Sequence, residues 1–492
     1  MFFDMSRSHN EEMRFHLLQN EKMRKIFIYS LWFTLVTASF LMSEPFACAQ
    51  TSTYYRQKKR GKRVTGKITA PVNMKKSASL DLIYTGDFFT NARGGYEQHS
   101  DYCYALDLII SGTLESFPWG RNATYGFDFI GVEGVNPSDT VGDFQGISNI
   151  AAQQTWKPYE TWFQFDILKE RLSFLLGMFD INSEFYVNET AAIFLNSAFA
   201  LGSEFAQSES NGVPTFPNPG LGLRLKTRLS DSISLKTAIM DGDTNTPDKT
   251  WNQYYRLDRN EGALLSMEIS FTSHEEKLKT VAPSSKRFQR RRNRMRTDHL
   301  MNTFNRFGRG RQKDRSSLME VPKGRYSKLT LGSWYYTAEF NNLVEKNTAT
   351  NKIQRGNWGV YSTGEKMLWQ DAGNPIQAVS IFFHAGISDK DVNKVDMSFA
   401  GGFVYSGIFI KHFQNQIGCG LTAAHISDGF QTALMDIGEK TDDWEIAAEI
   451  TYRTQVNKTL SFQPDIQYIF DPGFNPGLEN ALVCGIRFEI AF

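Results

Sequence analysis

Apolar and polar residues alternate strictly along many segments of this chain, and this period-two pattern constrains the fold more than any other feature. Residues 482–492 show it most clearly, because Leu, Cys, Ile, Phe, Ile and Phe occupy every second position. The positions between them hold Val, Gly, Arg, Glu and Ala. Successive side chains of a β-strand point to opposite faces, so this segment has one apolar face and one face with charges. The pattern predicts a β-strand.

The same alternation recurs at residues 460–470, 444–453, 221–229 and 161–167, where Asp, Glu, Gln, Arg or Lys separates the apolar residues. One such strand also suits a soluble sandwich, whose polar face is solvated. Many strands of roughly ten residues, spread over about four hundred residues, indicate a barrel with lipid outside and water inside. Because lipid cannot satisfy an open sheet edge, the sheet must close. We therefore expect an all-β transmembrane antiparallel β-barrel, with the soluble sandwich as the alternative.

The sequence contains about sixteen candidate strands, an even number within the range of bacterial outer-membrane barrels. Their expected bounds are Ser77–Asn91, Tyr102–Leu114, Ala123–Glu133, Tyr159–Leu168, Leu172–Glu184, Gly220–Leu229, Ser232–Asp241, Gly262–Thr272, Lys328–Phe340, Asn357–Trp369, Ile376–Ile387, Ser398–Phe409, Gln416–Ile426, Trp444–Gln455, Thr459–Asp471 and Ala481–Phe492.

Residues 1–49 are interpreted as an N-terminal extension followed by a cleaved secretory signal. A basic pair precedes the largely apolar residues 26–42, and small residues at 47–49 form a cleavage site. Either Met1 or Met23 is the true start. The alternative is an uncleaved membrane anchor, because the apolar stretch is near the lower length limit for a span. No later segment has about eighteen consecutive apolar residues, which excludes a helical membrane protein.

The formal net charge of +1 hides a strong asymmetry between segments. Residues 50–76 contain nine Lys or Arg and no acidic residue, and residues 277–328 contain seventeen basic and three acidic residues. The rest of the chain therefore carries about −22. We expect a basic periplasmic linker at 50–76, an outer-membrane barrel at 77–492, and a basic insert in one periplasmic turn at 273–327.

The basic insert allows two interpretations. One is a solvated, disordered linker. The other is docking of residues 277–325 to an anionic periplasmic surface, such as phospholipid headgroups, through screened electrostatics. An exported chain is not expected to bind nucleic acid, although Arg-rich runs with Phe also occur in RNA-binding segments.

One long connection is a candidate for narrowing the barrel. If the last strand ends in the periplasm, the short turns fall on the periplasmic side and the long connections outside. Residues Tyr186–Pro219 are then the third external loop, which in porins folds inward. We expect the same inward-folded third loop here. Its phenylalanines have the alternative role of packing the loop against the wall.

No enzyme, metal or cofactor site is expected. His384, His412 and His425 show no spacing to a nucleophile, so an outer-membrane enzyme is the disfavoured alternative. Without the signal, only Cys103, Cys419 and Cys484 remain, an odd and sparse set without metal or disulfide spacing.

Several blocks of the sequence resemble those of the carbohydrate-selective (OprB-type) porins. They are GMFDINSEF (177–185), FPNPGLGLRLK (216–226), RGNWGVYSTGEKMLWQ (355–370), GGFVYSGIF (401–409), IGCGLTAAHISD (417–428) and QPDIQYIFDPG (463–473). The resemblance covers roughly Ser77 to Phe492 except the basic insert. It implies a sixteen-stranded outer-membrane pore that passes mono- and disaccharides without energy input. A porin selective for anions or acidic oligosaccharides is the alternative, because of a local Arg/Lys row.

The expected partners follow from this resemblance: neutral sugars as permeants, outer-membrane lipid, and the barrel-assembly machinery through the C-terminal strand ending at Phe492. The chain is expected to be a monomer or a homotrimer.

A neutral sugar needs hydrogen-bond donors and acceptors along its path and apolar surfaces for its C–H faces. Trp162 is the expected stacking surface, and the basic row Arg224, Lys226 and Arg228 is expected to face acidic residues of the third loop. A stiffening salt bridge in the lumen is the alternative role for each charged residue. The expected path and constriction residues are Trp162, Gln164, Asp166, Glu184, Glu189, Asn196, Glu204, Arg224, Lys226, Arg228, Lys236, Glu268, Glu449 and Arg487.

Overall fold

A computed structural model describes ten stretches of the chain: residues 77–114, 123–168, 171–208, 213–242, 262–275, 325–343, 353–374, 376–408, 415–457 and 459–492. The expected signal (1–49) and basic linker (50–76) lie outside these residues. So does the basic insert except for its two ends. The proposed docking of 277–325 therefore stays a prediction.

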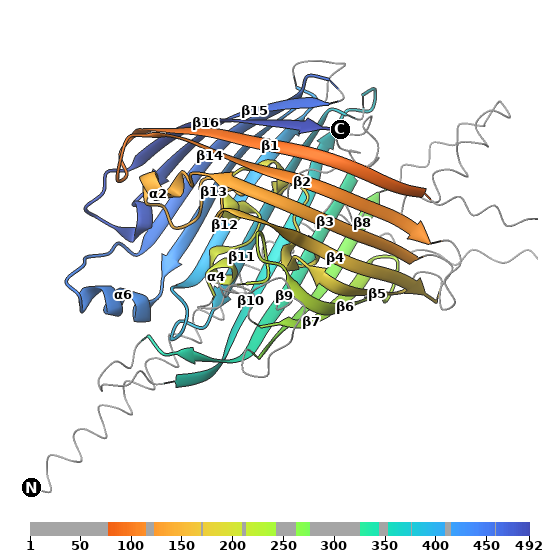
Figure 1. Cartoon of the computed structure of the whole chain (residues 1–492), viewed down its shortest axis with the longest axis horizontal. Coiled ribbons are helices and arrows are strands. Elements are labelled where there is room, and N and C mark those ends of the chain that lie inside the picture. Colours follow the sequence, from red (N-terminus) through yellow and green to blue (C-terminus); the bar gives the residue numbers. More distant parts are fainter. Residues whose placement is uncertain are drawn as a thin grey trace, which may run out of the picture. The chain divides into compact units, whose positions relative to one another are not determined.

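Within the described residues, sixteen antiparallel strands form one closed barrel (Figure 1). Each strand pairs with the next along the chain, and β1 pairs with β16. This confirms the expected all-β, sixteen-stranded antiparallel barrel. The strands are β1 (Ser77–Arg93), β2 (Ser100–Leu114), β3 (Ala123–Gly134), β4 (Thr155–Ile167), β5 (Leu172–Phe179), β6 (Gly220–Arg228), β7 (Ile233–Asp241), β8 (Ala263–Glu275), β9 (Arg325–Asn341), β10 (Ile353–Gln370), β11 (Ala378–Ser388), β12 (Val395–Ser406), β13 (Asn415–Ile426), β14 (Trp444–Gln455), β15 (Leu460–Phe470) and β16 (Ala481–Ala491).

The two faces of the strands differ as the alternation predicts. On the last three strands, Ile450, Ile466 and Ile486 are exposed on the outward face. Their neighbours Glu449 and Asp465 are buried on the inward face. A closed ladder leaves no unpaired edge, so the apolar face can meet lipid around the whole circumference. In the part of the chain that the structure describes, no helix is long and apolar enough to cross a bilayer.

Strand β5 ends earlier than the alternation suggests. We expected it to run to Glu184, but it ends at Phe179 and a short helix, α3 (Ile181–Glu184), follows. The cause is Asp180, whose carboxylate accepts a hydrogen bond of 2.7 Å from the backbone N–H of Asn182. Aspartate is a preferred N-cap because it satisfies such an amide. Strands β8 and β9 are instead longer than expected. They extend into the ends of the expected insert, to Glu275 and Arg325.

The remaining short elements lie in the connections between strands. Helix α2 (Ser138–Val141) follows β3, and η1 (Ala191–Ile193), η2 (Ser197–Phe199) and α4 (Ser203–Ala206) follow α3. Helix α6 (Asp428–Met435) follows β13, and η5 (Pro472–Phe474) follows β15.

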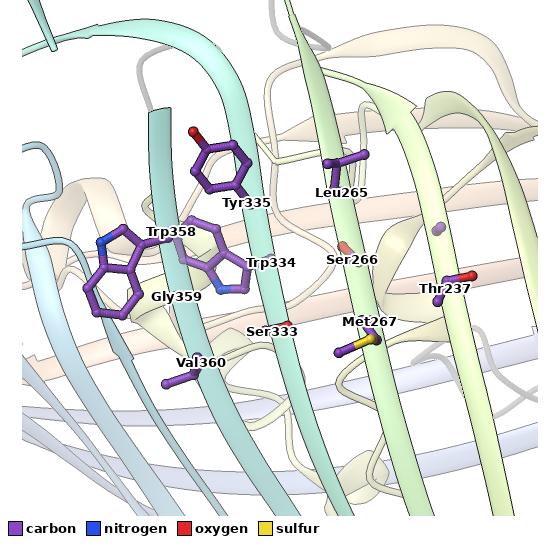
Figure 2. Close-up of a pocket in the computed structure, with 11 residues that line it drawn as sticks. Thr237, Leu265, Ser266, Met267, Ser333, Trp334, Tyr335, Trp358, Gly359 and Val360 are labelled. Atoms are coloured by element: carbon purple, nitrogen blue, oxygen red, sulfur yellow. The ribbon is translucent and has the colours of Figure 1, made fainter. Parts of the chain in front are cut away.

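A concavity of about 490 Å³ lies on the wall between β7 and β10 (Figure 2). Its lining includes Leu265, Met267, Tyr335, Trp358 and Val360, all of which are exposed on the outward face. It therefore opens toward the side of the wall that meets lipid, and it is not part of a path through the barrel.

The assignment of the outward face can be tested with one charge. We expect Ile450→Arg, in the middle of β14 where the side chain is 53% exposed, to lower the free energy of unfolding by ~2–4 kcal/mol, because the cation would enter hydrocarbon. Reversible urea unfolding in lipid bilayers measures this. The control is Ile437→Arg, outside the strands and 71% exposed, which should be nearly neutral. Equal effects at both positions would contradict the outward assignment.

Candidate functional site

Two connections run inside the barrel, against the polar faces of the strands. The first inner segment is residues 142–150, between β3 and β4, and the second inner segment is residues 180–208, between β5 and β6. Glu445 accepts hydrogen bonds from the backbone N–H groups of Phe144 at 2.8 Å and Gln145 at 3.0 Å. Since Glu445 points inward from β14, the first inner segment lies in the lumen.

The second inner segment is held in the same way at three points. Glu449 of β14 accepts from the backbone N–H groups of Leu195 at 2.7 Å and Asn196 at 2.9 Å. Glu268 of β8 accepts from Tyr186 N–H at 2.6 Å, and Glu365 of β10 accepts from Thr190 N–H at 2.9 Å. Hydrogen bonds to a carboxylate are stronger than those between neutral groups. Inward carboxylates from three separate strands therefore fasten this segment across the lumen.

The wall also provides space for the phenylalanines of the second inner segment. Phe194 and Phe199 stack with 4.3 Å between ring centroids, next to Phe382 of β11. A side chain at Gly420 of β13 would clash with them, because an added Cβ would lie 2.8 Å from the Phe199 ring. Packing against the wall, the alternative role considered for these phenylalanines, is what the structure shows.

The structure brings part of the basic row together with the acidic residues of the second inner segment. The Arg224 guanidinium lies 3.1 Å from the Glu184 carboxylate, and both side chains are buried. Arg224 also donates to Gln164 at 2.8 Å. Beside them, the Lys236 ammonium lies 2.6 Å from the Glu268 carboxylate.

Other expected path residues lie at different levels of the lumen. Asp166 and Lys226 are half-buried and face the same way, because each pairs in register with Ser173 of β5. Arg228 is exposed at the end of β6, and Glu189 is exposed on the second inner segment. Asn196 is buried, where its side-chain amide donates to Gln467 at 3.2 Å.

The expectation for Trp162 needs correction. Its side chain is only 5% exposed and packs in a core with Phe179, Phe185 and Phe205. The indole N–H donates to Glu160 at 3.2 Å. Because the second inner segment covers this part of β4, the ring has no free face on which a sugar can stack.

Sequence reasoning missed two features of the site. Asp87 and Glu365 were not selected, although their inward positions follow from the alternation in β1 and β10. The first inner segment was missed altogether, because it has no periodicity and its connection is shorter than the one between β5 and β6. Among the described residues, no group of three His, Cys, Asp or Glu side chains is placed to hold a metal, and Cys103, Cys419 and Cys484 are free.

Glu204 forms a polar contact between the second inner segment and the wall. Its carboxyl accepts from the Tyr186 hydroxyl at 3.0 Å and from the Ser398 hydroxyl of β12. It lies directly over Gly386 of β11, where an added Cβ would collide with it. His384 lies edge-on against the Tyr186 ring. Burial raises the pKa of Glu204 to about 7, because the two hydroxyl groups compensate the charge only in part.

We expect this contact to weaken as pH rises. A carboxyl whose pKa is raised by burial stabilises the packed arrangement fully below its ordinary pKa of 4.5, and that contribution is lost as pH rises through about 7. Single-channel recordings between about pH 5 and about pH 9 should show a noisier open current in alkaline solution. Glu204→Gln should reduce this dependence, whereas the exposed control Glu439→Gln should retain it in full. A dependence as large in Glu204→Gln as in the wild type would assign it to another group.

Comparisons with known proteins agree with this architecture. The family model described as carbohydrate-selective porin, OprB family, matches residues 100–492. Porin B of Pseudomonas aeruginosa is 21% identical over 449 residues, which cover 85% of this chain and 88% of that protein. The high-pH structure of Pseudomonas putida OprB matches with a TM-score of 0.66 at 19% identity, covering 84% of this chain and 94% of that one. At this identity, the structural match establishes the shared fold.

Proposed function

The chain belongs to the carbohydrate-selective porin (OprB) family, and from this premise we propose that its two inner segments form the constriction through which sugars pass. The protein is an outer-membrane porin for the passive diffusion of mono- and disaccharides. The proposal concerns how this chain narrows its lumen and why it admits neutral solutes.

The pairing of opposite charges inside the barrel carries the proposal. Three buried inward cations each lie against a carboxylate: Arg224 against Glu184, Lys236 against Glu268, and Arg487 against Asp87. A lining of one sign selects ions, whereas each of these pairs contributes no net charge. Half-buried polar residues elsewhere on the inward faces then supply donors and acceptors for the hydroxyl groups of a neutral solute. The anion-selective alternative relied on the basic row, and its first and most buried member, Arg224, pairs with Glu184.

The less buried polar residues are the proposed contacts for a sugar on its way to the constriction. Asp166 and Lys226 are half-buried on the inward faces of β4 and β6. Arg453 and Glu489 form a partly exposed ion pair of 3.4 Å on β14 and β16. Glu189 extends from the second inner segment. Such groups can exchange hydrogen bonds between water and successive sugar hydroxyls, which permits passage without tight binding.

The proposal also covers assembly. Phe492 continues the ladder beyond β16, because its N–H donates to the Leu82 carbonyl at 2.9 Å, while its side chain is 60% exposed. We propose that this strand end is what the barrel-assembly machinery recognises. The transport proposal applies equally to a monomer and a homotrimer, because one chain builds the whole path.

Charge substitutions at one ion pair test the transport proposal. We expect the wild-type pore to show weak ion selectivity and a current that neutral disaccharides reduce. Glu184→Gln leaves Arg224 unpaired and should shift reversal potentials toward anion selectivity, and Arg224→Gln should shift them toward cation selectivity. The double variant, which removes both charges, should return to weak selectivity. Planar-bilayer recordings under a salt gradient measure all four proteins.

Two results would contradict the transport proposal. One is strong anion selectivity of the wild type without any block by sugars, which favours the anion-selective alternative. The other is a pair of single variants that shift the reversal potential in the same direction, because the ion pair would then not lie on the conducting path.

A further inference from the structure

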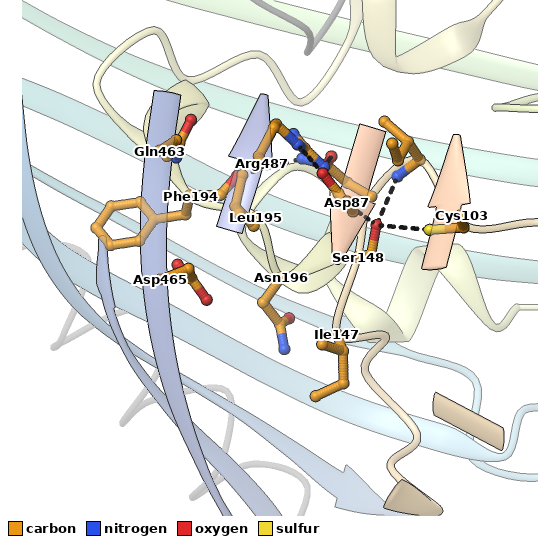
Figure 3. Close-up of polar contacts among 12 residues, drawn as sticks. Asp87, Cys103, Ile147, Ser148, Phe194, Leu195, Asn196, Gln463, Asp465 and Arg487 are labelled. Atoms are coloured by element: carbon orange, nitrogen blue, oxygen red, sulfur yellow. Dashed lines mark hydrogen bonds and ion pairs between the residues drawn. The ribbon is translucent and has the colours of Figure 1, made fainter. Parts of the chain in front are cut away.

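The barrel closes where its first and last strands meet, and a buried ion pair lies at that seam. Asp87 of β1 and Arg487 of β16 are direct partners in the register. The Arg487 guanidinium donates to both carboxylate oxygens of Asp87, from Nε and from Nη2, each at 2.6 Å (Figure 3). Both side chains are buried on the inward face. The pair is therefore a two-point contact across the closing strand pair.

The same ion pair holds the first inner segment. The Ser148 hydroxyl donates to Asp87 Oδ2 at 2.6 Å, and Arg487 Nη2 donates to the side-chain oxygen of Asn149 at 2.8 Å. Asp87 thus binds Ser148, and Arg487 binds the next residue, Asn149. Figure 3 shows Ser148 against Asp87, with the second inner segment beyond them.

Asn149 connects this contact to the second inner segment. Its side-chain nitrogen donates to the Phe194 carbonyl at 3.2 Å, and its backbone N–H donates to the Leu195 carbonyl at 2.8 Å. An amide side chain has one accepting end and one donating end. Because Arg487 holds the accepting end, the donating end must face Phe194. Leu195 in turn donates to Glu449 on the far side of the contact.

We propose that Asp87 and Arg487 are positioning residues for the constriction, and that Asn149 transmits the position of the closed seam to the second inner segment. The inference rests on the constriction proposed above. In this arrangement, closing the barrel and setting the width of the lumen are one event, because the same ion pair does both.

The competing explanation is that the ion pair only joins β1 to β16 and does not position the inner segments. The net stability from a buried ion pair is small, because desolvation of both charges offsets their attraction. A pair that only joined β1 to β16 would also give no reason for the hydrogen bonds to Ser148 and Asn149. Positioning of the inner segments accounts for both the pair and the two bonds that extend from it.

The substitution Asn149→Asp separates the two explanations. The aspartate keeps an oxygen for Arg487 but replaces the donor toward the Phe194 carbonyl with a second oxygen, which that carbonyl repels. We expect the dissociation constant for disaccharide block of the current to increase about tenfold. The conductance in salt without sugar should rise. Heat-modifiable mobility and the urea midpoint should stay at wild-type values, because the seam pair remains.

Two further variants complete the experiment. Asp87→Asn breaks the seam pair and should lower the urea midpoint and weaken the sugar block together. The control is Asn475→Asp in the β15–β16 connection, which adds the same negative charge but keeps the oxygen that accepts from Gly477 N–H at 2.9 Å. This variant should change neither the urea midpoint nor the sugar block. If Asp87→Asn does not assemble, Asn149→Asp still decides.

The proposal is overturned if Asn149→Asp leaves both sugar block and salt conductance unchanged. It is also overturned if Asp87→Asn lowers stability while the pore behaves as wild type. A wild-type pore that sugars do not block would refute the constriction itself. Even then, the salt conductance of Asn149→Asp still reports whether the seam positions the inner segments.

Discussion

Hydrogen bonds that backbone amides donate to inward-facing carboxylates determine what the interior of this barrel can hold. The two inner segments form no strands, so the N–H groups outside their short helical turns have no partners in a β-ladder. A buried amide without a partner costs free energy comparable to a lost hydrogen bond. Glu268, Glu365, Glu445 and Glu449 supply these partners from the wall. The inner segments can therefore be fixed in position without joining the sheet.

The same carboxylates constrain the charge of the lumen. A carboxylate that accepts from backbone amides can also pair with a cation of the wall. Glu268 shows both roles, because it accepts from Tyr186 N–H and lies 2.6 Å from the Lys236 ammonium. Arg224 and Glu184 extend the balance onto the second inner segment itself. In the proposed pore, holding the segment and pairing the charges of the lumen follow from one set of contacts.

Much of the wall could be predicted from sequence, because lipid outside and water inside impose a local pattern. Residues 460–470 and 481–491 alternate so regularly that their strands and faces follow directly. The pairing of the basic row with Glu184 could also be predicted, because both belong to segments whose charged residues are evident in the sequence. Trp162 was assigned wrongly, because alternation gives the inward direction of a side chain but not what covers it.

The contacts inside the barrel could not be predicted from the sequence, for a physical reason. Glu445 and Phe144 are 301 positions apart, and Arg487 and Asp87 are 400 apart, so their contacts leave no trace in local periodicity. Such contacts form only after long loops close, which makes them late in folding. The seam pair forms only when the last strand joins the first, and Ser148 and Asn149 of the first inner segment bond to that pair. In the proposed arrangement, the inner segments therefore reach their final position only when the C-terminal strand has joined the first.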